Sequence, residues 1–447
     1  MPRGGDRIWP YHPELLSKPV PRYTSYPTAA EFTDDFTGET LADALDAVGE
    51  AEPVSLYLHI PYCREICWYC GCNTGAANRG ARLAGYLEAL RREIDLVGAR
   101  LGGRERVRRV AFGGGSPNAL DPAQFASLAD AVRRAFRLDE PVLSVEIDPR
   151  GFDAAWARAL GDAAVSRVSL GVQTLAPHLQ AAIGRVQPFE AIAETMALLR
   201  GAGVESINFD LMYGLPGQSD ADMLDTLERA IDLGPDRLAV FGYAHVPHLI
   251  PRQRRIDATA LPGAPARFDQ AELAYRFLTA AGYEPVGFDH FARPGDELAR
   301  ATRRGQLHRN FQGFTEDGAK VLIGLGASAI SEFPDRLLQN EKNAGRYREL
   351  IGGGAFAIAR GVWRDMEDQR RGTIIADLLT RGSALLPGNL DLSQELAALG
   401  PFEAAGLVVR DGGSLRLEAT ALPYARTIAA VFDRHRPDSA VRFSAAV

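Results

Sequence analysis

The four cysteines of this chain lie within ten residues, and this clustering constrains the fold more than any other feature. They are Cys63, Cys67, Cys70 and Cys72, in the segment CREICWYCGC. A disulfide framework spreads its cysteines so that the bridges connect distant segments, and this clustering disfavours one. We therefore expect a fold that depends on its hydrophobic core and carries one local cysteine site.

The first three cysteines have the spacing C-x3-C-x2-C, which suits an iron–sulfur cluster. A structural zinc site more often pairs two C-x2-C segments or adds histidines at a set distance, and the sequence supplies no such second half. A cluster commonly takes four thiolates, so three cysteines leave one iron open. An open iron can bind a substrate or a cofactor.

The composition is that of an ordinary soluble globular protein, with 46% hydrophobic and 24% charged residues in 447. The formal net charge of −7 gives no basic excess, so nucleic acid is not an expected partner. No stretch approaches the roughly 18 to 20 apolar residues that a membrane helix needs. Residues 1–11 lack the apolar core of a secretory signal, so we expect a cytoplasmic protein without a membrane span.

Short β-branched runs alternate with longer amphipathic runs through most of the chain, which predicts repeated βα units and a parallel sheet. The expected strands are residues 54–60, 107–112, 142–148, 167–172, 206–212, 237–241 and 284–288. The expected helices are residues 82–96, 122–136, 189–200, 220–233 and 269–280. Such folds place their sites at the carboxyl ends of the strands. A long loop is expected at residues 251–265.

The pattern changes after about residue 360. Helices are expected at 366–379 and 390–399, then a hairpin of 406–410 with 414–418, and a last helix from Thr420. This order resembles a winged-helix module, but the segment lacks a clustered basic face, which argues against DNA binding. We divide the chain into a substrate-contacting arm and lead-in (1–52), a βα domain (53–345) and a mostly helical domain (346–447).

Several polar or glycine-rich segments come where the expected strands end. Residues 112–117, FGGGSP, let a backbone approach a ligand closely, although a tight turn explains the glycines equally well. Glu146 and Asp148 alternate along one strand, so that both lie on one face and need a ligand or a partner. Gln173 and Asp210 end the next two strands, and structural hydrogen bonding remains the alternative for each.

The segment YLHIPYC at 57–63, leading into the spaced cysteines, resembles the signature of the radical S-adenosylmethionine (radical SAM) superfamily. The resemblance implies a partial (β/α) barrel in which Cys63, Cys67 and Cys70 hold a [4Fe-4S] cluster. The open iron would bind S-adenosylmethionine, and Cys72 would be left over. The expected fold class is thus α/β, with a mostly helical, winged-helix-like module at the C-terminal end.

Further segments resemble one branch of that superfamily, the oxygen-independent coproporphyrinogen III oxidases, over about residues 20–360. They are PRYTSYPT at 21–28, GVQ at 171–173, PDRLAVFGYAH at 235–245, FDHFARPGDEL at 288–298 and LHRNFQG at 307–313. The resemblance implies oxidative decarboxylation of two propionates of coproporphyrinogen III to vinyl groups, giving protoporphyrinogen IX. A 5′-deoxyadenosyl radical would abstract the hydrogen atoms.

The same resemblance implies two bound S-adenosylmethionine molecules. The first would contact Tyr57, Gly113, Gly114, Glu146 and Ile330. The second would contact Gly115, Ser116, Gln173, Arg185, Asp210 and Ala244, with Tyr69 nearby. Arg185 would suit the carboxylate and Asp210 a ribose or amino group by charge pairing.

The candidate catalytic residues are Cys72, His59 and Glu146. His59 is either a proton or electron relay or a structural histidine, and Cys72 either acts on the substrate or is a small residue in a tight loop. Arg22, Arg293 and Arg309 are candidates for binding the substrate's propionates, against the alternative of surface salt bridges.

The expected partners are the porphyrinogen, an electron donor such as a flavodoxin or ferredoxin, and an unidentified electron acceptor. We expect a monomer. Two alternatives keep the same scaffold, a haem chaperone of the same branch and a radical SAM methyltransferase. A third, a redox-sensing DNA-binding protein, would need the basic face that the sequence lacks.

Overall fold

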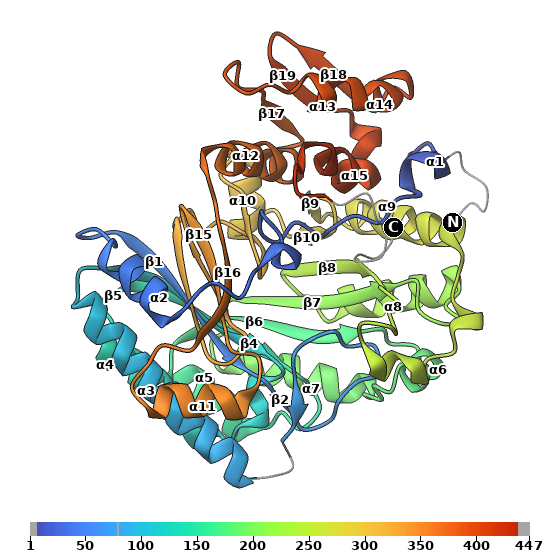
Figure 1. Ribbon diagram of the computed structural model, residues 1–447. Helices are drawn as coiled ribbons and strands as arrows, with labels where there is room; N and C mark the ends of the chain where they lie inside the picture. The colour runs from blue at the N-terminus through green and yellow to red at the C-terminus, as the bar shows by residue number, and fades with distance from the viewer. Residues whose placement is uncertain (1–6, 78–79, 437–447) are drawn as a thin grey trace.

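One large sheet forms the body of the protein in the computed structural model, which describes residues 7–77 and 80–436 (Figure 1). Twelve strands follow the order β16-β15-β14-β13-β1-β4-β5-β6-β7-β8-β10-β9. Within the described residues the two outer strands, β16 and β9, do not pair with each other, so the sheet curves as a partial barrel.

The central strands confirm the predicted βα repeat. The parallel strands of this repeat are β1 (Pro53–Ile60), β4 (Arg106–Gly114), β5 (Leu138–Ile147), β6 (Val165–Gln173), β7 (Ser206–Tyr213) and β8 (Arg237–Gly242). The helices between and after them are α3 (Gly80–Leu101), α4 (Pro122–Ala135), α5 (Ala154–Asp162), α6 (Pro177–Ala182), α7 (Phe189–Gly201), α8 (Asp220–Asp232) and α9 (Ala264–Ala280). In β1 every residue after Pro53 is buried, as expected for a parallel strand covered on both faces.

Further strands and short elements extend the sheet or cap its ends. Those in the sheet are β9 (Glu284–Val286), β10 (His290–Ala292), β13 (Val321–Leu325), β14 (Ile330–Phe333), β15 (Arg336–Asn340) and β16 (Ile358–Trp363). The others are β2 (Tyr62–Cys63), β3 (Gly75–Ala76), η2 (Pro117–Ala119), α10 (Glu297–Arg303), β11 (His308–Asn310), β12 (Gly313–Thr315) and α11 (Ala344–Gly352). The sequence analysis missed β13 to β16. The loop expected at 251–265 contains two short turns, η3 (Pro251–Arg255) and η4 (Ala258–Ala260), and the start of α9.

The main sheet continues past the predicted domain boundary at residue 345. β16 pairs with β15 in the large sheet, and α11 packs against α3. Both elements therefore belong to the barrel side, and the structural change comes after Trp363 instead. Residues 1–6 and 437–447 of the predicted outer domains lie outside the described residues.

The C-terminal part has the predicted order of elements. It contains α12 (Met366–Arg381), β17 (Ser383–Leu385), α13 (Ser393–Ala398), α14 (Gly400–Ala404), β18 (Val408–Asp411), β19 (Ser414–Leu417), η5 (Ala419–Tyr424), α15 (Ala425–Ala429) and η6 (Ala430–Phe432). β18 and β19 form the expected hairpin, to which β17 adds a third antiparallel strand. The hydrophobic core runs without a break from the barrel into this module. No described helix is long and apolar enough to cross a membrane.

The N-terminal arm crosses from the barrel to the C-terminal module. It contains α1 (Pro13–Leu16), η1 (Ala29–Glu31) and α2 (Gly38–Asp46). The Trp9 amide donates a hydrogen bond to Glu272 of α9, at 3.3 Å. The Tyr23 hydroxyl donates to Asp433, which follows η6, at 2.9 Å. The arm thereby links the two parts of the molecule.

Glu93 of α3 is a fully buried carboxyl group that holds the turn between β13 and β14. Its Oε2 accepts hydrogen bonds from the Gly326 amide and the Tyr347 hydroxyl, both at 2.6 Å. Its Oε1 accepts from Nδ2 of Asn340 at 2.7 Å. Burial raises the pKa of Glu93 to about 7, and the three donors oppose that shift.

We expect Tyr347→Phe to lower the free energy of unfolding by about 1–3 kcal/mol, because it removes one donor from a buried carboxyl group. Denaturant unfolding of the purified protein measures this difference. Tyr275→Phe is the matched control, since the hydroxyl of Tyr275 has no hydrogen bond among the described residues. Equal midpoints for the two variants would contradict the prediction.

Candidate functional site

The cysteine loop begins directly after β1 and is fixed at both ends by backbone hydrogen bonds. The Gly75 amide donates to the Pro61 carbonyl and the Ala77 amide to the Cys63 carbonyl, both at 2.9 Å. The Ser116 amide, from the glycine-rich turn after β4, donates to the Tyr62 carbonyl at 2.8 Å. The loop therefore closes over the carboxyl ends of β1 and β4, where the sequence predicted a site.

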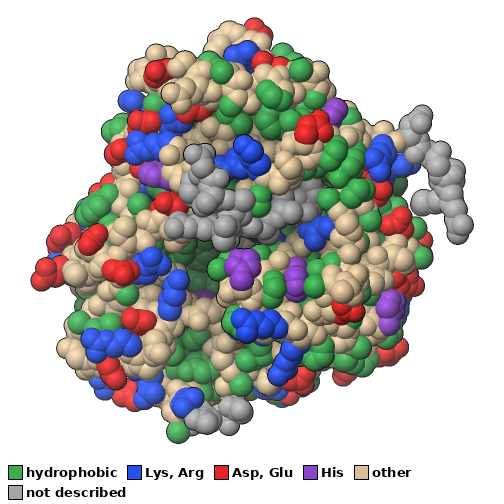
Figure 2. Space-filling view, turned by 45° about the vertical axis from the view of Figure 1, so that its right-hand side comes forward, with side chains coloured by type: hydrophobic (Ala, Val, Ile, Leu, Met, Phe, Trp, Pro, Cys, Tyr) green, Lys and Arg blue, Asp and Glu red, His purple; other side chains and the backbone are tan. Residues whose placement is uncertain are grey.

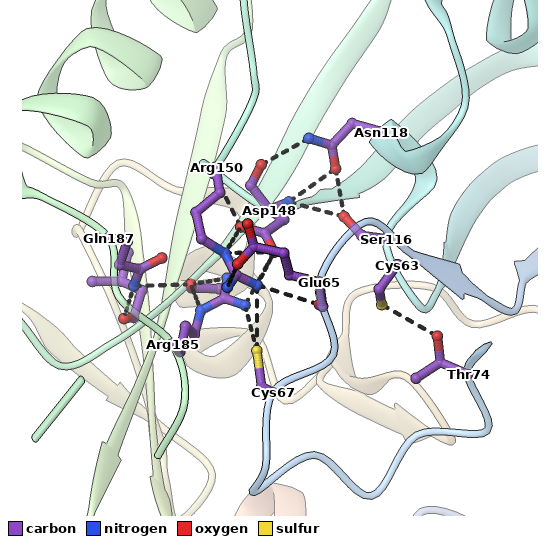
Figure 3. A network of polar contacts seen from close by, with 12 residues as sticks. Cys63, Glu65, Cys67, Thr74, Ser116, Asn118, Asp148, Arg150, Arg185 and Gln187 are labelled. Atoms are coloured by element: carbon purple, nitrogen blue, oxygen red, sulfur yellow. Dashed lines mark hydrogen bonds and ion pairs between the residues drawn. The ribbon is translucent and has the colours of Figure 1, made fainter. Parts of the chain in front are cut away.

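All four cysteines are free thiols in different surroundings. Burial raises the pKa of Cys63 to about 11, and the hydrogen bond with Cys72 lowers the pKa of Cys70 to about 6. The same hydrogen bond raises the pKa of Cys72 well above its ordinary value, so that this thiol stays protonated. The Cys67 sulfur accepts hydrogen bonds from two arginines (Figure 3).

The donor set fits an iron–sulfur cluster better than a single metal ion. Within residues 7–77 and 80–436, no three histidine, cysteine or carboxylate side chains are close enough to hold one ion. A [4Fe-4S] cluster is wider than an ion, and each of its cysteine ligands binds a different iron. Three unpaired thiols, Cys63, Cys67 and Cys70, on one short loop suit such a cluster.

The glycine run after β4 is required by close backbone contacts. A Cβ atom at Gly113 would lie 2.6 Å from the Glu146 carboxylate, and one at Gly115 would lie 2.4 Å from the Tyr62 carbonyl oxygen. Gly114 has a φ of 112°, and a Cβ there would lie 2.5 Å from the His59 ring. Side chains at these positions would push β1, β4 and β5 apart.

A cavity of about 550 Å³ opens beside the cysteine loop. Of the predicted residues, it is lined by Tyr57, His59, Cys72, Gly114 and Glu146. Figure 2 shows a recess in the surface, with hydrophobic side chains inside it and Lys, Arg and His side chains near its edge. The structure thus brings three of the five residues predicted for the first S-adenosylmethionine, and all three candidate catalytic residues, to one space; Gly113 and Ile330 are not among the described residues that line it.

His59 is held between Tyr57 and the cysteine loop. Its Nδ1 lies 3.2 Å from the Tyr57 hydroxyl and its Nε2 lies 3.4 Å from the Asn73 carbonyl oxygen. Burial lowers the pKa of His59 to about 4, so the ring is neutral near pH 7. A neutral ring that donates from Nε2 to the carbonyl accepts at Nδ1 from Tyr57. His59 therefore orients both neighbours.

Glu146 reaches the cavity from the end of β5. Its Oε2 accepts a hydrogen bond from the Gly114 amide at 3.0 Å. Glu146 is exposed to the open cavity, and partial loss of hydration between the protein walls, together with the nearby Asp210, raises the pKa of its carboxyl group to about 7. Asp148, two residues further on, instead pairs with Arg150 and Arg185.

A second cavity of about 300 Å³ lies inside the barrel and shares Glu146 with the first. Asp210 lines it and accepts hydrogen bonds from Ser169 at 2.9 Å and Asn208 at 2.8 Å. Burial raises the pKa of Asp210. Gln173, nearly buried at the end of β6, has a φ of 67°, an unusual backbone conformation for a side-chain-bearing residue.

Ser116, Tyr69, Ala244 and Ile330, also predicted as contacts, are not among the described residues that line either cavity. Ser116 accepts a hydrogen bond from the Asp148 amide at 3.1 Å. Tyr69 and Ala244 present carbonyl oxygens to Nε2 of Gln253, at 2.8 and 3.0 Å. The backbone of Ile330 in β14 passes close to Gly324. A Cβ atom at Gly324 would lie 2.4 Å from the Ile330 carbonyl oxygen.

Arg22 and Arg309 lie together at the carboxyl end of β8. Nη2 of Arg22 donates to the Gly242 carbonyl at 3.1 Å, and Nη2 of Arg309 donates to the Arg22 carbonyl at 3.1 Å. Burial lowers the pKa of Arg309 to about 10. Burial opposes ionisation of the adjacent Asp289, but His290, Arg309 and Arg22 outweigh it, so its pKa lies below the usual range.

Arg293 lies elsewhere. Its Nε donates to the Pro235 carbonyl at 3.0 Å, and its guanidinium packs over Tyr283. Pro235 precedes β8, at the opposite end from Gly242, so the structure separates Arg293 from Arg22 and Arg309. The sequence prediction that grouped all three is corrected accordingly.

Sequence reasoning missed several residues of the site. Gln312 lines both cavities, and Phe311 packs edge-on against Tyr57 with ring centroids 4.7 Å apart. Gln253 connects the cysteine loop to residue 244, and Arg150 contacts Cys67. Gln312 and Phe311 lie in the 307–313 segment that carried the resemblance, whereas Arg150 and Gln253 gave no separate signal.

Comparisons with known proteins identify the family of this chain. A sequence profile of the Radical SAM superfamily matches residues 57–230. An oxygen-independent coproporphyrinogen III oxidase from Bradyrhizobium diazoefficiens is 43% identical, covering 93% of this chain and 94% of that protein. A second such oxidase, from Cereibacter sphaeroides, is 41% identical, covering 94% of this chain and 95% of that protein. The chain belongs to the oxygen-independent coproporphyrinogen III oxidase family.

A solved structure extends the likeness to the whole fold of this family. Coproporphyrinogen III oxidase from Escherichia coli, described as a radical SAM enzyme, superposes with a TM-score of 0.90 at 34% identity. The match covers 96% of this chain and all of that one. The chain is therefore an oxidoreductase of the radical SAM type, whose cofactors are a [4Fe-4S] cluster and S-adenosylmethionine.

We expect S-adenosylmethionine to bind the cluster-loaded protein about tenfold more tightly at pH 8 than at pH 6, because Glu146 ionises between these values. In the expected arrangement the carboxylate accepts hydrogen bonds from the ligand, and protonation removes the negative charge that strengthens them. Equilibrium binding across this pH range measures the change. Glu146→Gln should bind weakly with a flatter profile, which separates Glu146 from the ligand's own titration. An unchanged profile in the variant would contradict the assignment.

Proposed function

We propose that this protein converts coproporphyrinogen III to protoporphyrinogen IX without oxygen, by oxidative decarboxylation of two propionates to vinyl groups. The carrying observation is the near full-length match to coproporphyrinogen III oxidases, in a fold where the cysteine loop borders a cavity lined by Tyr57, His59, Cys72 and Glu146. Each propionate loses a hydrogen atom, carbon dioxide and one electron.

Cys63, Cys67 and Cys70 hold the cluster in this proposal, and the cavity beside them receives S-adenosylmethionine. The bound cluster and S-adenosylmethionine together supply a 5′-deoxyadenosyl radical that abstracts the hydrogen atom. Tyr57, the backbone at Gly113 and Gly114, Glu146 and Ile330 orient the first S-adenosylmethionine. His59 fixes Tyr57 and the loop through the contacts described above, which is a positioning role.

A second S-adenosylmethionine binds on the inner side of the barrel. Gly115, Ser116, Gln173, Arg185, Asp210, Ala244 and Tyr69 are its proposed surroundings. Support comes from the second cavity, which Asp210 lines and which shares Glu146 with the first. In this structure all three guanidinium nitrogens of Arg185 already donate to protein groups, so its contact with the ligand would replace or share one of these hydrogen bonds.

The substrate's propionates are proposed to bind near Arg22 and Arg309. Nη1 of Arg309 is buried and has no hydrogen-bond partner among the described residues. The guanidinium lies over Phe314, 4.5 Å from the ring centroid, so its plane is fixed for a carboxylate. Cys72 is exposed and lines the cavity, which suits a contact with the substrate.

Other partners follow from the electron balance. An electron donor such as a flavodoxin or ferredoxin reduces the cluster, and an unidentified acceptor takes the electron left by each decarboxylation.

We propose a cytoplasmic monomer without a nucleic-acid partner. The haem chaperone and the methyltransferase remain less favoured, because the full-length relatives reported above are coproporphyrinogen oxidases.

Anaerobic turnover tests the proposed reaction. The reconstituted protein receives S-adenosylmethionine, dithionite, an electron acceptor and coproporphyrinogen III, and chromatography follows 5′-deoxyadenosine and protoporphyrinogen. Both products are expected together. Deoxyadenosine without the decarboxylated porphyrinogen would favour the methyltransferase, and neither product with tight haem binding would favour the chaperone.

Arg309→Gln should raise the KM for coproporphyrinogen III about tenfold, because a hydrogen-bonded ion pair with a carboxylate is worth about 1.5–3 kcal/mol. Arg293→Gln is the matched control and should keep the wild-type KM, since Arg293 lies at the other end of β8. Steady-state kinetics with both variants measures the difference. Equal KM values for Arg309→Gln and wild type would remove Arg309 from the substrate site.

A further inference from the structure

Cys67 differs from the other two proposed cluster ligands in the groups around its sulfur. Nη2 of Arg150 lies 3.3 Å from the Cys67 sulfur, and Nη1 of Arg185 lies 3.2 Å from it (Figure 3). The Cys63 sulfur instead contacts the Thr74 hydroxyl at 3.2 Å. Two guanidinium groups thus converge on one sulfur.

Arg150 is held in place by carboxylates on two sides. Its Nε donates to Oδ1 of Asp148 at 3.0 Å, and its Nη2 donates to Oδ2 at 2.6 Å. Its Nη1 pairs with Glu65 of the cysteine loop at 2.8 Å. The Arg150 side chain is only 12% exposed and Asp148 is 14% exposed, whereas Glu65 lies at the surface.

Asp148 ties the two arginines into one unit. Its Oδ2 accepts from Nη2 of Arg150 and also from Nη1 of Arg185, the latter at 3.2 Å. Arg185 is anchored further by two hydrogen bonds to the Gly171 carbonyl, at 3.0 and 2.6 Å. Each guanidinium therefore presents an N–H group to the sulfur without freedom to turn away.

Hydrogen bonds to cluster sulfurs influence the reduction potential, because reduction adds negative charge that an N–H donor stabilises. We propose that Arg150 is a positioning residue that raises the reduction potential of the cluster through its contact with Cys67. The inference rests on the proposed ligation of the cluster by Cys63, Cys67 and Cys70. The reducing electron comes from dithionite in the test and from the donor protein in turnover.

Arg150 is a better test of this contact than Arg185. Arg185 also supports the end of β6 through Gly171 and is a proposed ligand contact, so its loss would change several things. Arg150→Gln removes the donor from the sulfur. Arg150→Lys keeps a positive charge beside Asp148, but one ammonium group does not reproduce the planar set of contacts with Asp148, Glu65 and the sulfur.

The experiment is a potentiometric titration of the reconstituted cluster without S-adenosylmethionine. Electron paramagnetic resonance measures the amount of reduced cluster at each potential. At the wild-type midpoint potential, the ratio of reduced to oxidised cluster should fall about tenfold in both variants, which is about 59 mV for a one-electron couple. Arg64→Gln is the matched control. Arg64 lies on the same loop, but it donates to the Gly151 carbonyl and not to a sulfur. The midpoint potential of the cluster in Arg64→Gln should therefore equal the wild-type value.

Variants that hold a full cluster and titrate at the wild-type potential would overturn the proposal. Loss of the cluster from both Arg150 variants, with a full cluster in Arg64→Gln, would also overturn it, because Arg150 would then be needed only for assembly. A wild-type protein that assembles no cluster would overturn the proposed ligation itself. Iron content and circular dichroism separate these outcomes.

Discussion

The site depends on the close approach of three strand ends at the glycine run 113–115. The backbone there lies against the His59 ring, the Glu146 carboxylate and the Tyr62 carbonyl, at distances that leave no room for a Cβ atom. This contact brings the end of β4 to the start of the cysteine loop and fixes Glu146 through the Gly114 amide. The cavity, the cysteine loop and the proposed contacts with the first S-adenosylmethionine all depend on the absence of side chains at residues 113–115.

Polar side chains around the loop are arranged so that few of them are free to move. The neutral His59 ring spans Tyr57 and the Asn73 carbonyl, while Gln253 spans the carbonyls of Tyr69 and Ala244. Such cross-links between loops support a site in which the reacting groups must be positioned within fractions of an ångström. The protein contributes position, and the cofactors contribute the difficult chemistry.

The barrel and the cysteine loop were predictable from the sequence, because buried parallel strands are continuous apolar runs and the cysteines have a characteristic spacing. The strands after residue 320 were missed because they are only four to six residues long. β13 pairs parallel with β1, whereas β14 to β16 continue as antiparallel pairs to the edge of the sheet. Arg293 and Arg309 look alike in the sequence, and only the fold shows that they lie near opposite ends of β8. Arg150 has no sequence signal, because its role comes from a sulfur more than 80 residues away.

The unclosed sheet has a consequence for the size of the substrate. A closed eight-stranded barrel of parallel strands fills its own interior with side chains and leaves ligands only its rim. Here the described strands β16 and β9 do not pair, and two cavities that share Glu146 and Gln312 remain beside the strands of the sheet. A flat tetrapyrrole ring is too broad for the axis of a complete barrel. An incomplete barrel leaves one side open, which is the geometric requirement for a substrate of this breadth.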